Sequence, residues 1–151
     1  MINVEAVCNE LIRRSLYENI ELSPLKLQKL IYLIHAYGLS EEKKLFDIKF
    51  NAWKYGPVCD QIYQEFKSFK DKSITSYAQD AKGISYFPNW EYNGNSFLLS
   101  CVNKIWNKYK NFSGGDLISL THQNGSAWSK TLSNCPIKES DIKDDVLRGL
   151  Y

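Results

Sequence analysis

Apolar residues recur at helical spacing along most of the chain. In the first such segment, Val4, Val7, Cys8, Leu11 and Ile12 follow the i, i+3, i+4, i+7, i+8 pattern that places side chains on one helical face. The same spacing predicts further helices from Pro24 to Gly38, Pro57 to Lys70, Ser96 to Phe112, Ser113 to Asn124 and Ser140 to Leu150. We expect the helix over 96–112, which carries a long apolar stripe, to lie at the centre of the core.

Two of the helix starts carry explicit capping residues. Ser23 precedes Pro24, and a serine followed by proline at the first helical position is a preferred start. Ser113 and Asp116 have the spacing of a capping box, in which each side chain accepts a hydrogen bond from the other residue's backbone amide. This segment is therefore a helix start, and it lacks the Gly-Lys-Ser/Thr sequence of a phosphate-binding loop.

Alternating polarity is confined to a short segment. Residues 47–54 alternate as expected for a half-buried strand, and Gly56 and Pro57 then break the pattern. Residues 84–93 are poor in helix signals and contain a Pro-Asn turn between aromatic residues, which predicts a weak hairpin. The predicted fold class is therefore mainly α, with one compact helical domain over residues 1–151 and a short strand or small β-sheet near residues 47–54.

The composition agrees with a folded domain of ordinary size. The 151 residues are 44% hydrophobic and 24% charged, which excludes the apolar-poor composition of disordered chains. The formal charge of +2 is too small to attract nucleic acid or an anionic membrane through bulk electrostatics. No secretory signal is visible, and the longest fully apolar run, residues 30–34, is too short to span a membrane. We expect a cytoplasmic protein with no membrane partner.

The four cysteines do not form a metal-binding or disulfide pattern. Cys8, Cys59, Cys101 and Cys135 are tens of residues apart, and no two of them form a Cys-x-x-Cys pair. Cys8 and Cys101 fall on apolar stripes, where a free cysteine acts as a small hydrophobic residue. We expect free thiols, no metal and no cofactor.

His122 is the titratable residue whose position is most suggestive of chemistry. It lies at the end of a short predicted helix, with Asp116 within two turns, where a carboxylate could orient an imidazole that acts as a base. No serine or cysteine nucleophile motif accompanies it, so a structural histidine that hydrogen-bonds a helix end is favoured, and no catalytic residue is predicted. We expect His35 to be a hydrogen-bonded histidine in the core or at its boundary, and Lys26 and Lys29 to lie on a solvated helix face.

Lysines and aromatic residues are interleaved on the predicted helix over 96–112. Proteins that bind single-stranded nucleic acid combine such residues, because the rings stack on bases while the lysines contact phosphates. Here the aromatic residues share the apolar stripe of the helix, so packing into the core is favoured. We therefore expect no nucleic-acid partner.

Three segments resemble the signature of a known family. Ser23–Tyr32 contains a Lys-Leu-Gln-Lys-Leu-x-Tyr helix, Ala52–Val58 an Ala-Trp-x-x-Gly-Pro-Val turn, and Leu120–Trp128 a Thr-His pair followed by tryptophan. These segments occur in the order found in the Panacea domain, a family also described as SocA-like antitoxins or GepA-like phage-associated proteins. The signature residues of the resemblance are Lys26, Leu27, Gln28, Lys29, Leu30, Tyr32, Trp53, Gly56, Pro57, Val58, Thr121, His122 and Trp128. Ala127 departs from the pattern, in which a proline often precedes the tryptophan.

The resemblance implies a bacterial or prophage antitoxin that binds and neutralises a protein toxin encoded beside it. It implies a protease or chaperone as a second partner, because one family member is similar to an adaptor that delivers its toxin to a protease. Trp53, Gly56, Pro57 and Trp128 are expected to be architectural, since the Gly-Pro turn fixes the angle between the predicted strand and the predicted helix and the tryptophans bury large areas. The alternative is a small prophage-associated hydrolase, or a nucleic-acid-acting enzyme or regulator, that uses His122.

The segment 71–95 has no counterpart in the family pattern. It contains Tyr77, Tyr86, Trp90 and Tyr92, and these two residue types are the ones most enriched at binding hot spots. We therefore expect these four aromatic side chains to anchor the partner protein. The alternative for each of them is packing onto the core of the domain itself.

Overall fold

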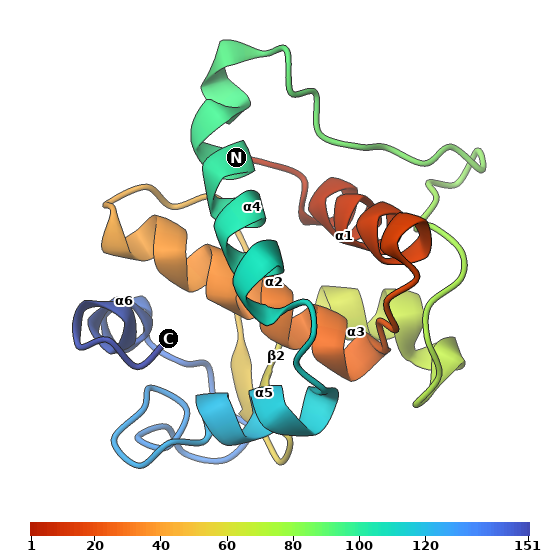
Figure 1. Cartoon of the computed structure of the whole chain (residues 1–151). Helices are drawn as coiled ribbons and strands as arrows, with labels where there is room; N and C mark the ends of the chain where they lie inside the picture. Colours follow the sequence, from red (N-terminus) through yellow and green to blue (C-terminus); the bar gives the residue numbers. More distant parts are fainter.

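Helix α2 (Pro24–Ser40) runs through the middle of the molecule and is contacted by every other α-helix (Figure 1). Residues 26–36 of this helix are all buried. A helix without a polar face is stable only when neighbours cover it on all sides. The centre of the core is therefore α2, and not the helix over 96–112 as the apolar stripe there predicted, because that helix buries only one of its faces.

The computed structural model describes residues 1–151. The other elements, in chain order, are α1 (Val4–Glu18), β1 (Asn51–Trp53), β2 (Gly56–Val58), α3 (Asp60–Phe66), the 3-10 helices η1 (Lys67–Phe69) and η2 (Asn93–Asn95), α4 (Ser96–Tyr109), α5 (Gly114–Thr121) and α6 (Glu139–Leu147). They form one mainly helical domain with a small two-stranded sheet, as predicted. No helix has the length and hydropathy that a bilayer crossing requires.

The predicted capping residues act as helix starts. The Ser23 hydroxyl accepts a hydrogen bond of 3.2 Å from the amide three residues later, and Ser113 and Asp116 form both bonds of a capping box.

Gly38, which was predicted to end the second helix, does not end α2, and the helix continues to Ser40. A Cβ atom at Gly38 would lie 2.6 Å from the carbonyl oxygen of Lys43, so the glycine permits a close approach of two backbone segments.

β1 and β2 form an antiparallel hairpin in which Ala52 pairs with Pro57 and Trp53 with Gly56. The predicted small sheet is confirmed, but the prediction that Pro57 starts the next helix is wrong. Gly56 has a φ angle of +110°, which other residues rarely adopt, and the chain leaves this turn as a second strand. α3 begins only at Asp60.

No strand forms at residues 84–93, so the predicted weak hairpin is absent. The segment between η1 and η2 runs past α1 as an extended loop instead (Figure 1). The Asn9 side chain in α1 donates to the carbonyl oxygens of Ala78 (3.1 Å) and Tyr86 (3.0 Å) and accepts from the Ala78 amide (2.8 Å). The Asn9 side chain therefore satisfies three backbone groups of this loop and fixes the path of the loop along α1.

The carboxyl-terminal part folds back onto α2. Ile142 of α6 is buried in the core, and α6 ends at Leu147, earlier than the predicted end at Leu150. Gly149 follows with a φ angle of +76°, a conformation that ends helices. The chain then turns, and the ring of Tyr151 packs edge-on against a ring of α2.

Candidate functional site

The residues of the family resemblance come together beside α2. Three of the apolar ones, Leu27, Leu30 and Tyr32, are fully buried in the core, and Val58 is buried in β2. Seven of the others lie where α2, the β1–β2 hairpin and the end of α5 are in contact. We call the following residues the signature cluster: Gln28, Lys29, Gly56, Pro57, Thr121, His122 and Trp128.

Gln28 joins α2 to the segment that connects β2 with α3. Its side-chain nitrogen donates to the carbonyl oxygen of Cys59 at 2.8 Å, and its side-chain oxygen accepts from the Cys59 amide at 3.0 Å. Gln28 is buried, and a buried amide side chain is stable only when its donor and acceptor are both used. This amide therefore holds the chain in place and is not free to bind a ligand.

Lys29 is fully buried, so the prediction of a solvated lysine face on α2 is wrong. Its ammonium donates to the carbonyl oxygen of Pro57 at 3.1 Å, and burial lowers the pKa of Lys29 to about 7. Lys26 is also buried, and its ammonium donates to the carbonyl oxygens of Glu21 and Lys110. The prediction failed because it assumed that one face of α2 meets water, whereas neighbours cover all of its faces.

Gly56 lets three elements approach one another. A Cβ atom there would lie 2.6 Å from Cε of Lys29 and 3.1 Å from Oγ1 of Thr121. The first distance is shorter than real Cβ contacts, and the second would require the threonine side chain to shift. Thr121 is buried, and its hydroxyl donates to the carbonyl oxygen of Leu117 at 3.0 Å. The hairpin, α2 and α5 are therefore packed without room for a ligand at this point.

His122 stacks on Trp128. The two ring centroids are 3.6 Å apart and the planes differ by 9°, while the Trp128 ring nitrogen donates to the carbonyl oxygen of Trp53 at 2.7 Å. Burial, and then the charge of nearby Lys29, lower the pKa of His122. The imidazole therefore holds its position by stacking, and the predicted hydrogen bond from its side chain to a helix end does not form: Nε2 is buried without a partner.

The expected partner of His122 is engaged elsewhere. The Asp116 carboxylate accepts the Ser113 amide at 2.9 Å in the capping box, at the opposite end of α5 from His122. Thr121 and Lys29, which lie nearest, are fully buried. A substrate therefore cannot reach these two groups, and Asp116 does not orient the imidazole.

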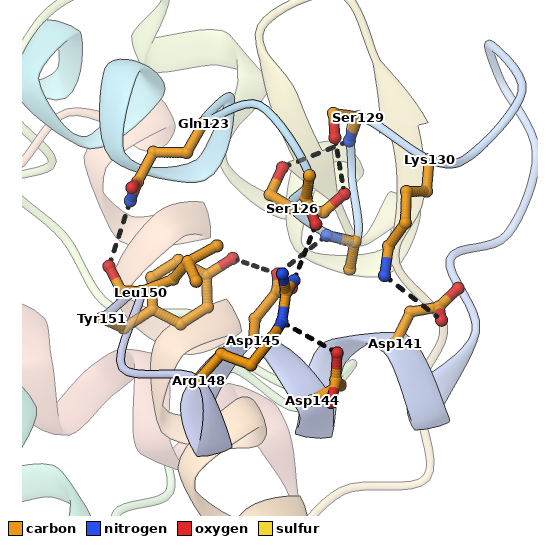
Figure 2. Close-up of polar contacts among 12 residues, drawn as sticks. Gln123, Ser126, Ser129, Lys130, Asp141, Asp144, Asp145, Arg148, Leu150 and Tyr151 are labelled. Carbon is orange, nitrogen blue, oxygen red and sulfur yellow. Dashed lines mark hydrogen bonds and ion pairs between the residues drawn. The ribbon is translucent and has the colours of Figure 1, made fainter.

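Asp145 of α6 is fully buried and is the centre of a second polar cluster (Figure 2). Its carboxylate accepts hydrogen bonds from the Ala127 amide (2.8 Å), the Tyr151 hydroxyl (2.8 Å) and the Arg148 guanidinium (3.1 Å). The Ser126 hydroxyl donates to the carbonyl oxygen at the end of α5 at 2.8 Å. Ala127 thus supplies an N–H group that the proline of the family pattern lacks.

Asp145 was not among the residues predicted from the sequence. Its position three residues after Ile142 and one before Val146 places it on the apolar face of α6, and a carboxylate on such a face signals a buried polar cluster. The partners could not be deduced, because they come from a turn and from the carboxyl-terminal residues.

The four aromatic residues of segment 71–95 are placed in two different environments. Tyr77 and Trp90 are partly buried and pack against the core, and the Tyr77 ring contacts Phe87 edge-on at 5.0 Å. Tyr86 and Tyr92 are 50% and 65% exposed. The Tyr86 hydroxyl donates to an exposed carboxylate of the same loop at 2.9 Å. Two of the four rings are therefore exposed on the surface, and the backbone of Tyr86 is bonded to α1 through Asn9.

The thiols and the second histidine occupy ordinary structural positions. All four cysteines are free, Cys135 is exposed, and burial raises the pKa of the other three thiols. No group of three histidine, cysteine or acidic side chains is arranged to hold a metal ion. His35 lies in the core against Phe46 and Phe50, and burial lowers its pKa to about 4. The predicted core position is confirmed, but the predicted hydrogen bonding is wrong for Nδ1, which is buried without a partner.

These features define a class of small helical domain whose signature residues hold three structural elements together. The model of the family described as "Antitoxin SocA-like, Panacea domain" matches residues 27–129, and the chain belongs to this family. The chain is also similar to the Antitoxin SocA of Caulobacter vibrioides (strain NA1000 / CB15N). The two are 26% identical over 145 residues, which cover 89% of this chain and 72% of the relative. No solved structure matches the chain at a significant level.

Proposed function

We propose that this protein is an antitoxin that neutralises a cognate protein toxin, encoded next to it, by binding it directly in the cytoplasm. Membership of the SocA-like family is the observation that carries this proposal, and the relative named Antitoxin SocA supports it over most of the chain. A protease or chaperone that receives the bound toxin is the second partner in this proposal.

The geometry of the signature cluster favours binding over catalysis. The polar groups of Gln28 and Trp128 form hydrogen bonds with backbone groups, and Lys29 is fully buried. The alternative, an enzyme or regulator that uses His122, requires a substrate to reach that ring, whose Nε2 is buried and whose face is covered by Trp128. We therefore assign the cluster to the scaffold that presents the binding surface.

We assign the partner contact to Tyr77, Tyr86, Trp90 and Tyr92. The exposed rings of Tyr86 and Tyr92 would enter the interface, while Tyr77 and Trp90, packed on the core, would hold the loop in shape. Exposed tyrosines contribute large contact areas with little conformational entropy to lose, which suits them to this role.

Co-expression with the neighbouring gene tests the proposal. That gene alone should arrest growth, and this protein should restore growth and co-elute with the gene's product. The double variant Tyr86→Ala/Tyr92→Ala should fold and should restore growth less well. Tyr17→Ala is the control, because Tyr17 of α1 is also an exposed tyrosine, with 86% of its surface accessible, and lies outside segment 71–95. A harmless neighbour, or rescue without a physical complex, would favour an enzyme or a regulator instead.

A further inference from the structure

A groove of about 390 Å³ lies between the start of α2, the turn of the β1–β2 hairpin and α3. Leu25 and Val58 contribute apolar lining, and Trp53 and Tyr63 stand together, with ring centroids 5.1 Å apart in an edge-to-face arrangement. Gln28 also lines the groove, and both of its polar groups are fixed by hydrogen bonds to the backbone. The groove is therefore preformed, apolar and partly aromatic.

The charged residues that line this groove are all cationic. They are Lys54, Lys67 and Lys70, and no aspartate or glutamate is among the lining residues. All three are exposed, and none takes part in an ion pair within the chain. Lys54 lies over the Tyr55 ring and Lys67 donates to Gln64, so both ammonium groups are held by neutral partners. The groove thus presents unneutralised positive charge around an apolar surface.

Lys70 occupies an unusual backbone conformation. Its φ angle is +56° and its ψ angle is −120°, a combination that favours glycine and is strained for other residues. Glycine at this position would therefore relieve the backbone strain and stabilise the fold. Side chains held in strained conformations are concentrated at binding sites, so the placement of a lysine here points to a use for its charge.

We propose that this groove binds a short acidic segment of the toxin, with an apolar side chain seated against the aromatic rings and carboxylates against the three lysines. The inference rests on the proposed function, because it assigns the segment to the toxin. It adds a contact surface separate from the tyrosines of segment 71–95, and it defines the chemistry of the partner. Complementary charges around an apolar centre orient the two partners as they meet and raise the rate of their association.

A protein segment fits this groove better than a nucleic acid does. The Trp53 and Tyr63 rings pack edge to face on each other and do not form a row of parallel platforms on which successive bases could stack. The lysines flank one small groove and do not form an extended stripe, and the net charge of the chain is only +2. Binding along a nucleic-acid backbone requires many such contacts in sequence.

The test uses the full chain and the purified product of the neighbouring gene. The charge-reversal variant Lys54→Glu/Lys67→Glu/Lys70→Glu should weaken binding at least about tenfold at 150 mM salt, and Tyr63→Ala should weaken it about tenfold. The matched control is Lys49→Glu/Lys108→Glu/Lys138→Glu, which changes the net charge equally at exposed lysines outside both the groove and segment 71–95. Lys70→Gly should raise the melting temperature while it weakens binding. Circular dichroism confirms that each variant folds.

The outcomes separate this inference from the proposed function. Loss of affinity in the groove variants, with wild-type affinity in the control, supports the acidic-segment site. Wild-type affinity in all variants overturns it and leaves the antitoxin function intact. If the wild-type protein does not bind or neutralise the neighbour's product, the antitoxin function and the acidic-segment site are both wrong. Groove-dependent binding of a 20-nucleotide single-stranded DNA, with toxin binding unchanged by the groove variants, would assign the groove to nucleic acid and also overturn the inference.

Discussion

Replacing Lys29 with methionine should remove a pH dependence from the stability of the protein. Burial lowers the pKa of Lys29 to about 7 in the folded chain, whereas an unfolded chain keeps the ordinary lysine pKa near 10.4. Between these two values the unfolded chain binds more protons than the folded one. The free energy of unfolding contributed by this group therefore rises with pH, from its lowest level below pH 7 to its full level above pH 10.

The size of this contribution follows from the two pKa values. Integration of the proton-binding difference from pH 7 to pH 9 gives a gain of about 2 kcal/mol in the free energy of unfolding. Methionine has a similar length without a titratable group, so it should abolish the gain. It also loses the hydrogen bond to the Pro57 carbonyl oxygen, which shifts the stability at every pH but does not change the slope.

Urea unfolding at pH 7, 8 and 9, followed by tryptophan fluorescence in the presence of a reductant, measures this slope. Lys72→Met is the matched control, because Lys72 is exposed and its side chain makes no hydrogen bond or ion pair. The difference between wild type and Lys29→Met should change by about 2 kcal/mol across this range, while the control should run parallel to wild type. Parallel curves for wild type and Lys29→Met would refute the argument that Lys29 is buried without an ionic partner.

Three further substitutions test the scaffold. Gly56→Ala should lower the free energy of unfolding by about 2–4 kcal/mol, because of the positive φ angle and the clash with Lys29; a loss within measurement error in urea unfolding would contradict this. Ala127→Pro should cost about 2 kcal/mol through loss of the amide bond to buried Asp145, whereas Ala127→Gly keeps that bond; equal melting temperatures for the two would count against it. His122→Gln should weaken the fold and leave affinity for the neighbour's product unchanged in titration calorimetry; a well-folded variant that loses turnover on any substrate would reveal an enzyme.

Local capping signals in the sequence predicted the starts of α2 and α5 correctly. Ser23 with Pro24, and Ser113 with Asp116, satisfy backbone groups within three residues of themselves, so the sequence contains all that is needed to recognise them. The apolar periodicity of α1 was likewise sufficient, because a helix that buries one face shows that face directly in its sequence.

Features that depend on distant residues could not be predicted. Lys29 is indistinguishable from a surface lysine until α5 and the hairpin are known to cover it, and Gly38 resembles a helix stop until Lys43 is known to lie against it. The path of segment 71–95 depends on Asn9, which is far away in sequence. In the candidate site, the residue types were visible in the signature, but the stacking of His122 on Trp128 required the structure.

Isothermal titration calorimetry of the purified protein with the purified product of the neighbouring gene tests the central claim most directly. A stoichiometric antitoxin predicts a saturable exothermic or endothermic signal that ends at a small whole-number ratio, and a complex of the summed mass in size-exclusion chromatography. Absence of a binding signal and separate elution of the two proteins, under conditions in which this protein still rescues growth, would contradict neutralisation by direct binding.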